Sequence, residues 1–169
     1  MTDVSKAEAL ILEQMRILPA ARFPINEVIG SVLREDVLAE RDHPPFDRVT
    51  MDGIAIKYVD WEHGLRCYRV VGSQGAGVQP LSIIKEAECI KIMTGAMLPD
   101  GADTVIPVER LTSDKKNILV ENTANVFKGQ YIHPCGSDRI AGSKLLSSGQ
   151  LIGPPEMAIL ASSGNASVQ

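Results

Sequence analysis

Two aspartates five residues apart, Asp47 and Asp52, are the side chains of this sequence best placed to do chemistry. They lie in residues 44–56, PPFDRVTMDGIAI, where two prolines prevent a helix and a glycine precedes a short apolar strand. Because Gly53 lets the backbone turn sharply or approach a ligand, we expect Asp52 at the mouth of a strand. The alternative is that both aspartates are turn and cap residues.

Two later segments carry residue types that suit an anionic ligand. In residues 90–107, IKIMTGAMLPDGADTVIP, the hydroxyl of Thr94 and the unhindered amide of Gly95 could donate to a phosphate or another oxyanion. Thr94 could equally be a hydroxyl that caps its own turn. Residues 136–142, GSDRIAG, add Asp138, which could orient metal-bound water or hold a cofactor through hydrogen bonds.

The three segments, in this order, resemble the molybdopterin molybdenumtransferases, the family of bacterial MoeA and the E domain of gephyrin. The family has a Pro-x-Phe-Asp run that leads into Met-Asp-Gly, then a Thr-Gly-Ala-x-x-Pro-x-Gly-Ala-Asp block, then Gly-Glu-Asp…Ala-Gly. The chain departs from this pattern at residues 48–50, where Arg-Val-Thr replaces a small polar run. It departs also at Ile54, where the family often has Tyr or Phe, and at Ser137, where it has Glu.

The resemblance implies insertion of molybdate into adenylylated molybdopterin, with Mg²⁺ as cofactor and release of AMP. It implies that Asp52, Thr94 and Asp138 are catalytic residues, and it assigns no direct metal ligand. The cofactor-binding residues that it implies are Asp47, Met51, Gly53, Gly95 and Ser137. Family members form homodimers whose active site is shared between subunits, and they continue into a molybdopterin-binding domain. We therefore expect this chain to be an amino-terminal portion that is inactive by itself.

Two other functions remain open at this stage. A non-catalytic dimerisation or docking module with the same fold would explain the departures at residues 48–50 and at Ser137. A free-standing metal hydrolase could use Asp47 and Asp52, but the sequence offers no histidine or third carboxylate at nearby ligand spacing.

The composition argues against several classes of partner. A net charge of −4 provides no basic excess to hold nucleic acid or an anionic membrane. No apolar run reaches the length of a membrane span and the first residues do not resemble a signal peptide, so we expect a cytoplasmic protein. Three widely spaced cysteines favour neither a disulfide framework nor structural zinc. His133 and Cys135 could share a metal, although a loop imidazole and a half-buried thiol are the commoner outcome.

The periodicity predicts an α+β chain that is mainly β. Ser5 and Glu8 have capping-box spacing at the start of a helix over residues 5–18, which Pro19 ends. Gly30 closes a one-turn helix over 26–29. A further helix runs from Pro154 to residue 160, and Gly164 is its stop signal. Strands are predicted over residues 32–38, 54–57, 65–71, 88–93, 104–110, 117–121, 144–146 and 165–168. Residues 72–77 are interpreted as a flexible connector and 114–117 as a hairpin loop.

These elements predict one domain that is interrupted in sequence by another. Residues 1–42 and 139–169 would form a mixed linker and dimerisation domain. In this domain the first helix would dock its apolar face on residues from the far end of the chain. Residues 43–138 would form an inserted all-β domain that carries one wall of the active site. The family resemblance implies the same division.

Overall fold

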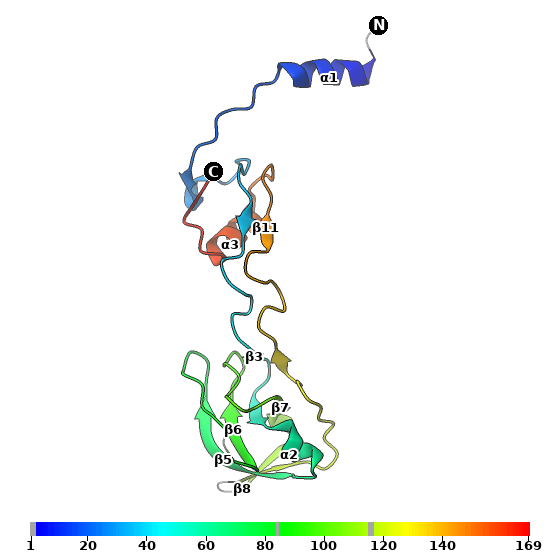
Figure 1. The fold of residues 1–169 in the computed structure, drawn as a ribbon, viewed down its shortest axis with the longest axis vertical. Helices are drawn as coiled ribbons and strands as arrows, with labels where there is room; N and C mark the ends of the chain where they lie inside the picture. Colours follow the sequence, from blue (N-terminus) through cyan, green and yellow to red (C-terminus); the bar gives the residue numbers. More distant parts are fainter. Residues whose placement is uncertain (1–2, 84, 115–116) are drawn as a thin grey trace. The chain divides into compact units, whose positions relative to one another are not determined.

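The computed structural model describes residues 3–83, 85–114 and 117–169 of the chain. The chain is mixed helix and strand, with most of its regular structure in sheets (Figure 1). It divides into two compact units. The first holds the chain up to Leu38 together with Lys144–Gln169, and the second is Ala39–Ser143. The second unit begins and ends a few residues outside the predicted limits of 43 and 138.

The first helix of the first unit differs from its prediction. Helix α1 is Val4–Gln14, and Asp3 rather than Ser5 is its N-cap residue. It ends before Pro19 because Met15 already has extended backbone (φ −76°, ψ 125°), and the residue before a proline also avoids helical backbone. Helix α1 buries none of its residues, so the predicted docking of its apolar face is not seen.

The rest of the first unit is a small core held by two strand pairs. Strand β1 (Phe23–Pro24) pairs with β12 (Ser167–Val168), and β2 (Val37–Leu38) pairs with β11 (Lys144–Leu146), both antiparallel. The predicted strand over 32–38 shrinks to β2, with the 3₁₀ turn η1 (Ile25–Glu27) before it. Helix α3 (Pro154–Ser162) starts at a proline as predicted, and Gly164 follows it with φ +79°. The core residues are Val28, Leu33, Val37, Leu146, Ile152, Leu160 and Val168.

The second unit is built on a six-stranded sheet in the order β7-β4-β6-β5-β9-β8. Its strands are β4 (Gly53–Ile56), β5 (Cys67–Gln74), β6 (Glu88–Ile92), β7 (Thr104–Pro107), β8 (Leu111–Asp114) and β9 (Asn117–Val120). Only β5 and β6 are parallel neighbours. Strand β8, which the sequence did not predict, pairs with β9 so that Asp114 faces Asn117. Residues 115–116 of the predicted hairpin loop lie outside the described residues.

The second unit is not all-β. Helix α2 (Tyr58–Glu62) follows β4, and the 3₁₀ turn η2 (Val108–Arg110) follows β7 where a continuous strand was predicted. Helix α2 forms because Asp103 Oδ1, which comes from a distant loop, accepts the backbone N–H of Tyr58 at 2.6 Å. No local pattern in residues 58–62 reveals that cap.

The flexible connector predicted over residues 72–77 is also wrong in its first half. Gly72, Ser73 and Gln74 continue β5, and Gln74 pairs with Ile92 of β6. Gln74 is fully buried, so its amide has to find partners inside the protein.

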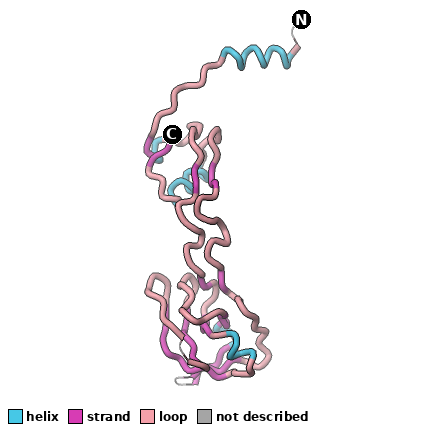
Figure 2. Tube along the Cα trace, viewed as in Figure 1, coloured by secondary structure: helices cyan, strands magenta, loops and turns pink. Residues whose placement is uncertain are grey.

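Short strands connect the sheet to the segment that carries Asp138. Strand β3 (Arg48–Val49) pairs with β10 (Ile132–His133), and beyond them two extended segments run side by side (Figure 2). Backbone hydrogen bonds join these segments, among them His43 N to Arg139 O at 2.7 Å and Ala39 N to Ser143 O at 2.8 Å. Within the described part of the chain, no helix is long and apolar enough to cross a membrane.

Candidate functional site

Asp52 and Thr94 are brought together at one end of the sheet. Asp52 immediately precedes β4, and Thr94 follows β6 by two residues. Because these strands are antiparallel neighbours with Gly53 opposite Ile92, the start of one lies beside the end of the other. Thr94 donates both its backbone N–H and its hydroxyl to Asp52 Oδ1, each at 2.7 Å.

This contact fixes the charge of Asp52. The backbone N–H of Thr94, and then its hydroxyl, lower the pKa of the Asp52 carboxyl below its ordinary value, and partial desolvation opposes them weakly. Asp52 is exposed and ionised at neutral pH, so it places a negative charge at the end of the sheet where β4 begins. The Thr94 hydroxyl, predicted to donate to an oxyanion, donates here to Asp52 together with the Thr94 backbone N–H.

The backbone geometry requires the glycines of the two motifs. A Cβ at Gly53 would overlap the carbonyl of Ile106 on the neighbouring strand β7. Gly95 has φ +86°, which favours glycine, and its N–H donates to Val49 O at 2.9 Å. The amide that the sequence analysis offered to an anion therefore holds the turn against β3. Met51, which directly precedes Asp52, is half-buried.

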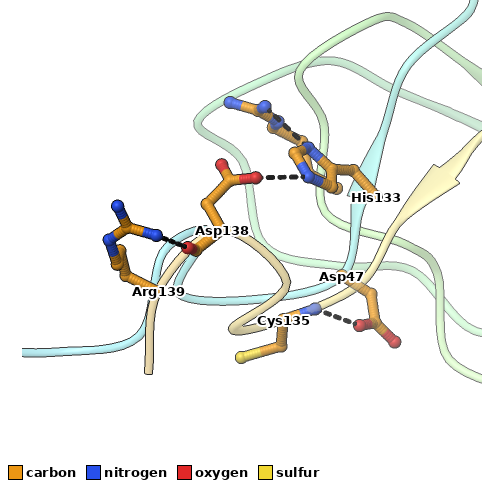
Figure 3. Close-up of polar contacts among 6 residues, drawn as sticks. Asp47, His133, Cys135, Asp138 and Arg139 are labelled. Atoms are coloured by element: carbon orange, nitrogen blue, oxygen red, sulfur yellow. Dashed lines mark hydrogen bonds and ion pairs between the residues drawn. The ribbon is translucent and has the colours of Figure 1, made fainter. Parts of the chain in front are cut away.

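The third motif lies on the other side of β3. The Cys135 backbone N–H donates to Asp47 Oδ1 at 2.8 Å, and Asp138 Oδ1 lies 3.0 Å from His133 Nε2 (Figure 3). The Asp138 backbone N–H donates to the carbonyl of His43 at 2.9 Å. Ser137 is exposed in this turn, with its N–H on Pro134 O.

Strand β3 joins the two groups of predicted residues. On one side Val49 N donates to Ala96 O and the Val49 carbonyl accepts from Gly95 N, each at 2.9 Å, and on the other side Val49 faces Ile132 of β10. The first two sequence motifs therefore meet at β3, and the third follows its partner strand β10. The Asp52–Thr94 pair and the Asp138 carboxylate are not hydrogen-bonded to each other among the described residues.

The sequence analysis missed Arg48 as a member of the site. Arg48 Nη2 lies 3.1 Å from His133 Nδ1, because Arg48 and His133 are directly opposite each other on β3 and β10. The imidazole therefore sits between Arg48 and Asp138. The departure of residues 48–50 from the family pattern was the one available signal for Arg48, and nothing local connected it with His133.

The side chains of His133 and Cys135 contact different partners. The ring nitrogens of His133 contact Arg48 and Asp138, and the Cys135 thiol lies 3.7 Å from Asp42 Oδ2. Desolvation and then the negative charge of Asp42 raise the pKa of the Cys135 thiol, which keeps it protonated. In the described ranges, no three His, Cys, Asp or Glu side chains gather closely enough to hold a metal ion.

Gln74 is a second residue that the sequence analysis missed. Its side-chain N–H donates to Met97 O at 2.7 Å, its side-chain oxygen accepts from Leu81 N at 2.7 Å, and its backbone carbonyl accepts from Met93 N at 3.2 Å. Met93 and Met97 bracket the turn that contains Thr94. Gln74 therefore holds both ends of that turn from inside the protein.

Asp52 also borders a cavity of about 290 Å³ at the end of the sheet. Apolar side chains from several strands line it, including Ile54, Leu111 and Ile118, and Lys91 adds a positive charge. An apolar hollow with a few polar groups is the usual composition of a small-molecule site.

The fold and site together define a known class of protein. Residues 2–164 match the family model of the MoeA N-terminal region (domain I and II), and the chain therefore belongs to that family.

Individual relatives agree with this assignment. The chain is 35% identical over its full length to a molybdopterin molybdenumtransferase of Synechocystis, of which it covers 43%. It is 32% identical to gephyrin of Dictyostelium discoideum over 97% of its length and 25% of that protein. A solved molybdopterin biosynthesis moeA protein of Pyrococcus horikoshii superposes with a TM-score of 0.85 at 30% identity, over 97% of this chain and 44% of that one. The chain corresponds to the amino-terminal portion of such proteins, less than half of their length.

Proposed function

We propose that this chain supplies one wall of the site at which molybdate is inserted into adenylylated molybdopterin with release of AMP, in the cytoplasm. Membership of the MoeA N-terminal family and the name of the Synechocystis relative, molybdopterin molybdenumtransferase, support the reaction class. The observation that carries the proposal is the exposed Asp52 carboxylate, held ionised by two Thr94 donors where the first and second motifs of this chain meet.

In this proposal the residues of the chain orient the ligand. Asp52 Oδ1 is occupied by Thr94, so Oδ2 is the atom that accepts a hydrogen bond from the substrate. The apolar cavity beside it excludes water from one face of a bound ring, and Lys91 lies close enough to that cavity to attract a phosphate. Asp138 contributes a second carboxylate from the far side of β3.

The predicted Mg²⁺ fits the donor set that the chain offers. Mg²⁺ in nucleotide sites is commonly held by one or two carboxylates, with substrate phosphates and water completing its coordination. Asp52 and Asp138, both exposed carboxylates, would orient water bound to the ion. When bound, the ion would neutralise charge on the anhydride oxygens, which an acidic wall would otherwise repel.

The second wall of the site must come from elsewhere. The relatives extend well beyond the part that this chain matches. In the proposal, the pterin-binding half lies in the remaining part, which this chain does not match. We propose a homodimer in which the Asp52 wall of one subunit faces the pterin-binding half of its partner. The 169 residues alone are then expected to release no AMP.

The experiment is a chimera in which this chain replaces the matching amino-terminal segment of the Synechocystis relative. The chimera should release AMP from adenylylated molybdopterin in the presence of molybdate and Mg²⁺, and the isolated chain should not. A mixture of the isolated chain with an Asp52→Asn chimera should regain part of the activity through hybrid dimers, whereas an isolated chain that carries Asp52→Asn should not restore it. Turnover by the isolated chain would overturn the shared-site model.

A second function, a non-catalytic docking or dimerisation module, is favoured by two specific residues. Arg48 and Ser137 depart from the family pattern inside the site itself. A chimera that forms dimers but releases no AMP would support this second function.

A further inference from the structure

Three side chains form a row that crosses the strands β3 and β10. Arg48 and His133 are register partners on β3 and β10, and Asp138 lies in the turn that follows β10. Arg48 Nη2 is 3.1 Å from His133 Nδ1, and His133 Nε2 is 3.0 Å from Asp138 Oδ1 (Figure 3). The imidazole is thus contacted through both of its nitrogens.

The chemistry of the two neighbours fixes the tautomer of the ring. A guanidinium has N–H donors and no acceptor, so its contact with Nδ1 is a hydrogen bond only when Nδ1 carries a lone pair. The proton of the neutral ring is then on Nε2, where it donates to the Asp138 carboxylate. The reverse tautomer would place two N–H donors against each other at Arg48 and two lone pairs against each other at Asp138.

We propose that His133 is a positioning residue for Asp138, and that Arg48 enables it by selecting the Nε2–H tautomer. This inference rests on the proposed function, in which Asp138 faces the substrate. An exposed aspartate samples several rotamers, and a single N–H from a ring anchored on a strand restricts that motion. With Oδ1 occupied by His133, Oδ2 of Asp138 is directed to the ligand.

The arrangement gives Arg48 a structural role at a position where the chain departs from the family pattern. Its positive charge lies on the far side of the imidazole from Asp138, so it polarises the ring without occupying the carboxylate. The His133 side chain is 28% exposed and that of Asp138 is 57% exposed, so the ring is the more fixed of the two partners. A simple surface ion pair of this exposure would contribute little, and it would not require one tautomer.

The first experiment reads the tautomer directly in the 169-residue chain by ¹⁵N NMR of the histidine rings at neutral pH. His133 should show a protonated Nε2 and an unprotonated Nδ1. Arg48→Met keeps the aliphatic stem and removes the donors, and it should convert the ring to a mixture of tautomers. Arg139→Met is the matched control, because the Arg139 guanidinium donates to the backbone carbonyl of Asp138, at 3.0 Å, rather than to the His133 ring, and it should leave the ring signals unchanged.

The second experiment measures turnover in the chimera described above. His133→Asn removes the donor at the Nε2 position and should lower kcat about tenfold with little change in KM, the scale of one lost orienting hydrogen bond. His133→Gln places an amide N–H near the same position and should restore most of the loss. Asp138→Asn should be more severe than either.

The outcomes separate this inference from the proposed function. If Asp138→Asn lowers turnover and His133→Asn does not, Asp138 functions without His133 and the positioning role is wrong. If Asp138→Asn is fully active, the role of Asp138 in the proposed function is wrong, and the positioning role is wrong with it. A wild-type ring that is protonated on Nδ1, or that does not respond to Arg48→Met, overturns the tautomer assignment whatever the chimera does.

Discussion

One oxygen of Asp52 accepts both hydrogen bonds that Thr94 can donate, from its backbone N–H and from its hydroxyl, each at 2.7 Å. The residues are 42 positions apart in sequence and meet because β4 and β6 are antiparallel neighbours. Thr94 therefore keeps Asp52 ionised and leaves its second oxygen for another partner. The predictions that follow depend on this geometry and on the residues that maintain it.

Replacing Asp52 by Asn should abolish most activity without unfolding the chain. The Asn side-chain oxygen can still accept from Thr94, and position 52 is exposed, so the packing is preserved. The negative charge is lost, and turnover of the chimera should fall roughly a hundredfold, as for other preorganised polar groups. Asp100→Asn is the control: Asp100 is an exposed carboxylate of the same unit, 3.4 Å from the Ser82 hydroxyl, and its change should leave turnover intact. Equal activity of the two variants would reduce Asp52 to a turn residue.

Thr94→Val should raise the pKa of Asp52. The variant removes the hydroxyl donor and keeps the backbone N–H, which is the larger cause of the lowered pKa, so the pKa should move only part of the way back to 3.8. A lowered pKa in the folded state stabilises the fold above the unfolded pKa, and this contribution disappears as the pH falls through the folded value. The stabilisation should therefore decline below about pH 4 in the wild type and be smaller in the variant.

The measurement is a ¹³C NMR titration of the Asp52 carboxyl in both proteins, with acid unfolding followed by circular dichroism. Thr112→Val, an exposed threonine on β8, is the control. A carboxyl that titrates at the same pH in wild type and Thr94→Val would show that the hydroxyl contact is absent in solution.

The sequence predicted the strands of the sheet better than it predicted their surroundings. Residues 54–57 and 88–93 contain apolar runs that favour buried strands in any context, and β4 and β6 are found there. The site residues came from the resemblance to a family. Once that resemblance had placed Asp52 and Thr94 in the same site, the pairing of β4 with β6 supplied the contact that neither motif contains.

Three of the features that were missed depend on partners distant in sequence. Helix α2 is capped by Asp103, 45 residues away, and Arg48 meets His133 across 85 residues. Gln74 follows a glycine and a serine, which are typical of a loop, yet it is buried because its amide binds two backbone groups of later segments. Local propensity cannot report such pairings, since tertiary contacts override it.

Gly53→Ala should destabilise the second unit. The added Cβ would collide with the Ile106 carbonyl, a backbone atom in a paired strand that cannot move aside cheaply. The free energy of unfolding should fall by about 2 kcal/mol or more, the scale of overpacking a rigid site. Gly75→Ala is the matched control, because a Cβ there has open space, and its effect should stay within about 1 kcal/mol. Urea unfolding measures both, and similar midpoints would contradict the close approach of β4 to β7.

Gln74→Leu should loosen the turn that carries Thr94. Leucine fills a similar volume but leaves Met97 O and Leu81 N without the side-chain partners that the glutamine provides. Loss of these contacts should cost about 1–3 kcal/mol and allow the segment from Met93 to Met97 to open more often. Amide hydrogen exchange at Thr94 should accelerate by the factor by which this segment opens more often. Exchange in the β8–β9 hairpin should change only as much as the global stability does.

Gln79→Leu is the control for this last change, because Gln79 is exposed and its replacement should alter neither stability nor exchange. The two variants also separate stability from site geometry. If Gln74 positions Thr94, the Asp52 carboxyl of Gln74→Leu should titrate closer to its ordinary pH, since the two Thr94 donors that lower its pKa are no longer held in place. Faster exchange at Thr94 with an unchanged Asp52 titration would mean that the Thr94–Asp52 contact persists without Gln74. Gln74 would then contribute to the stability of the fold and not to the position of Thr94.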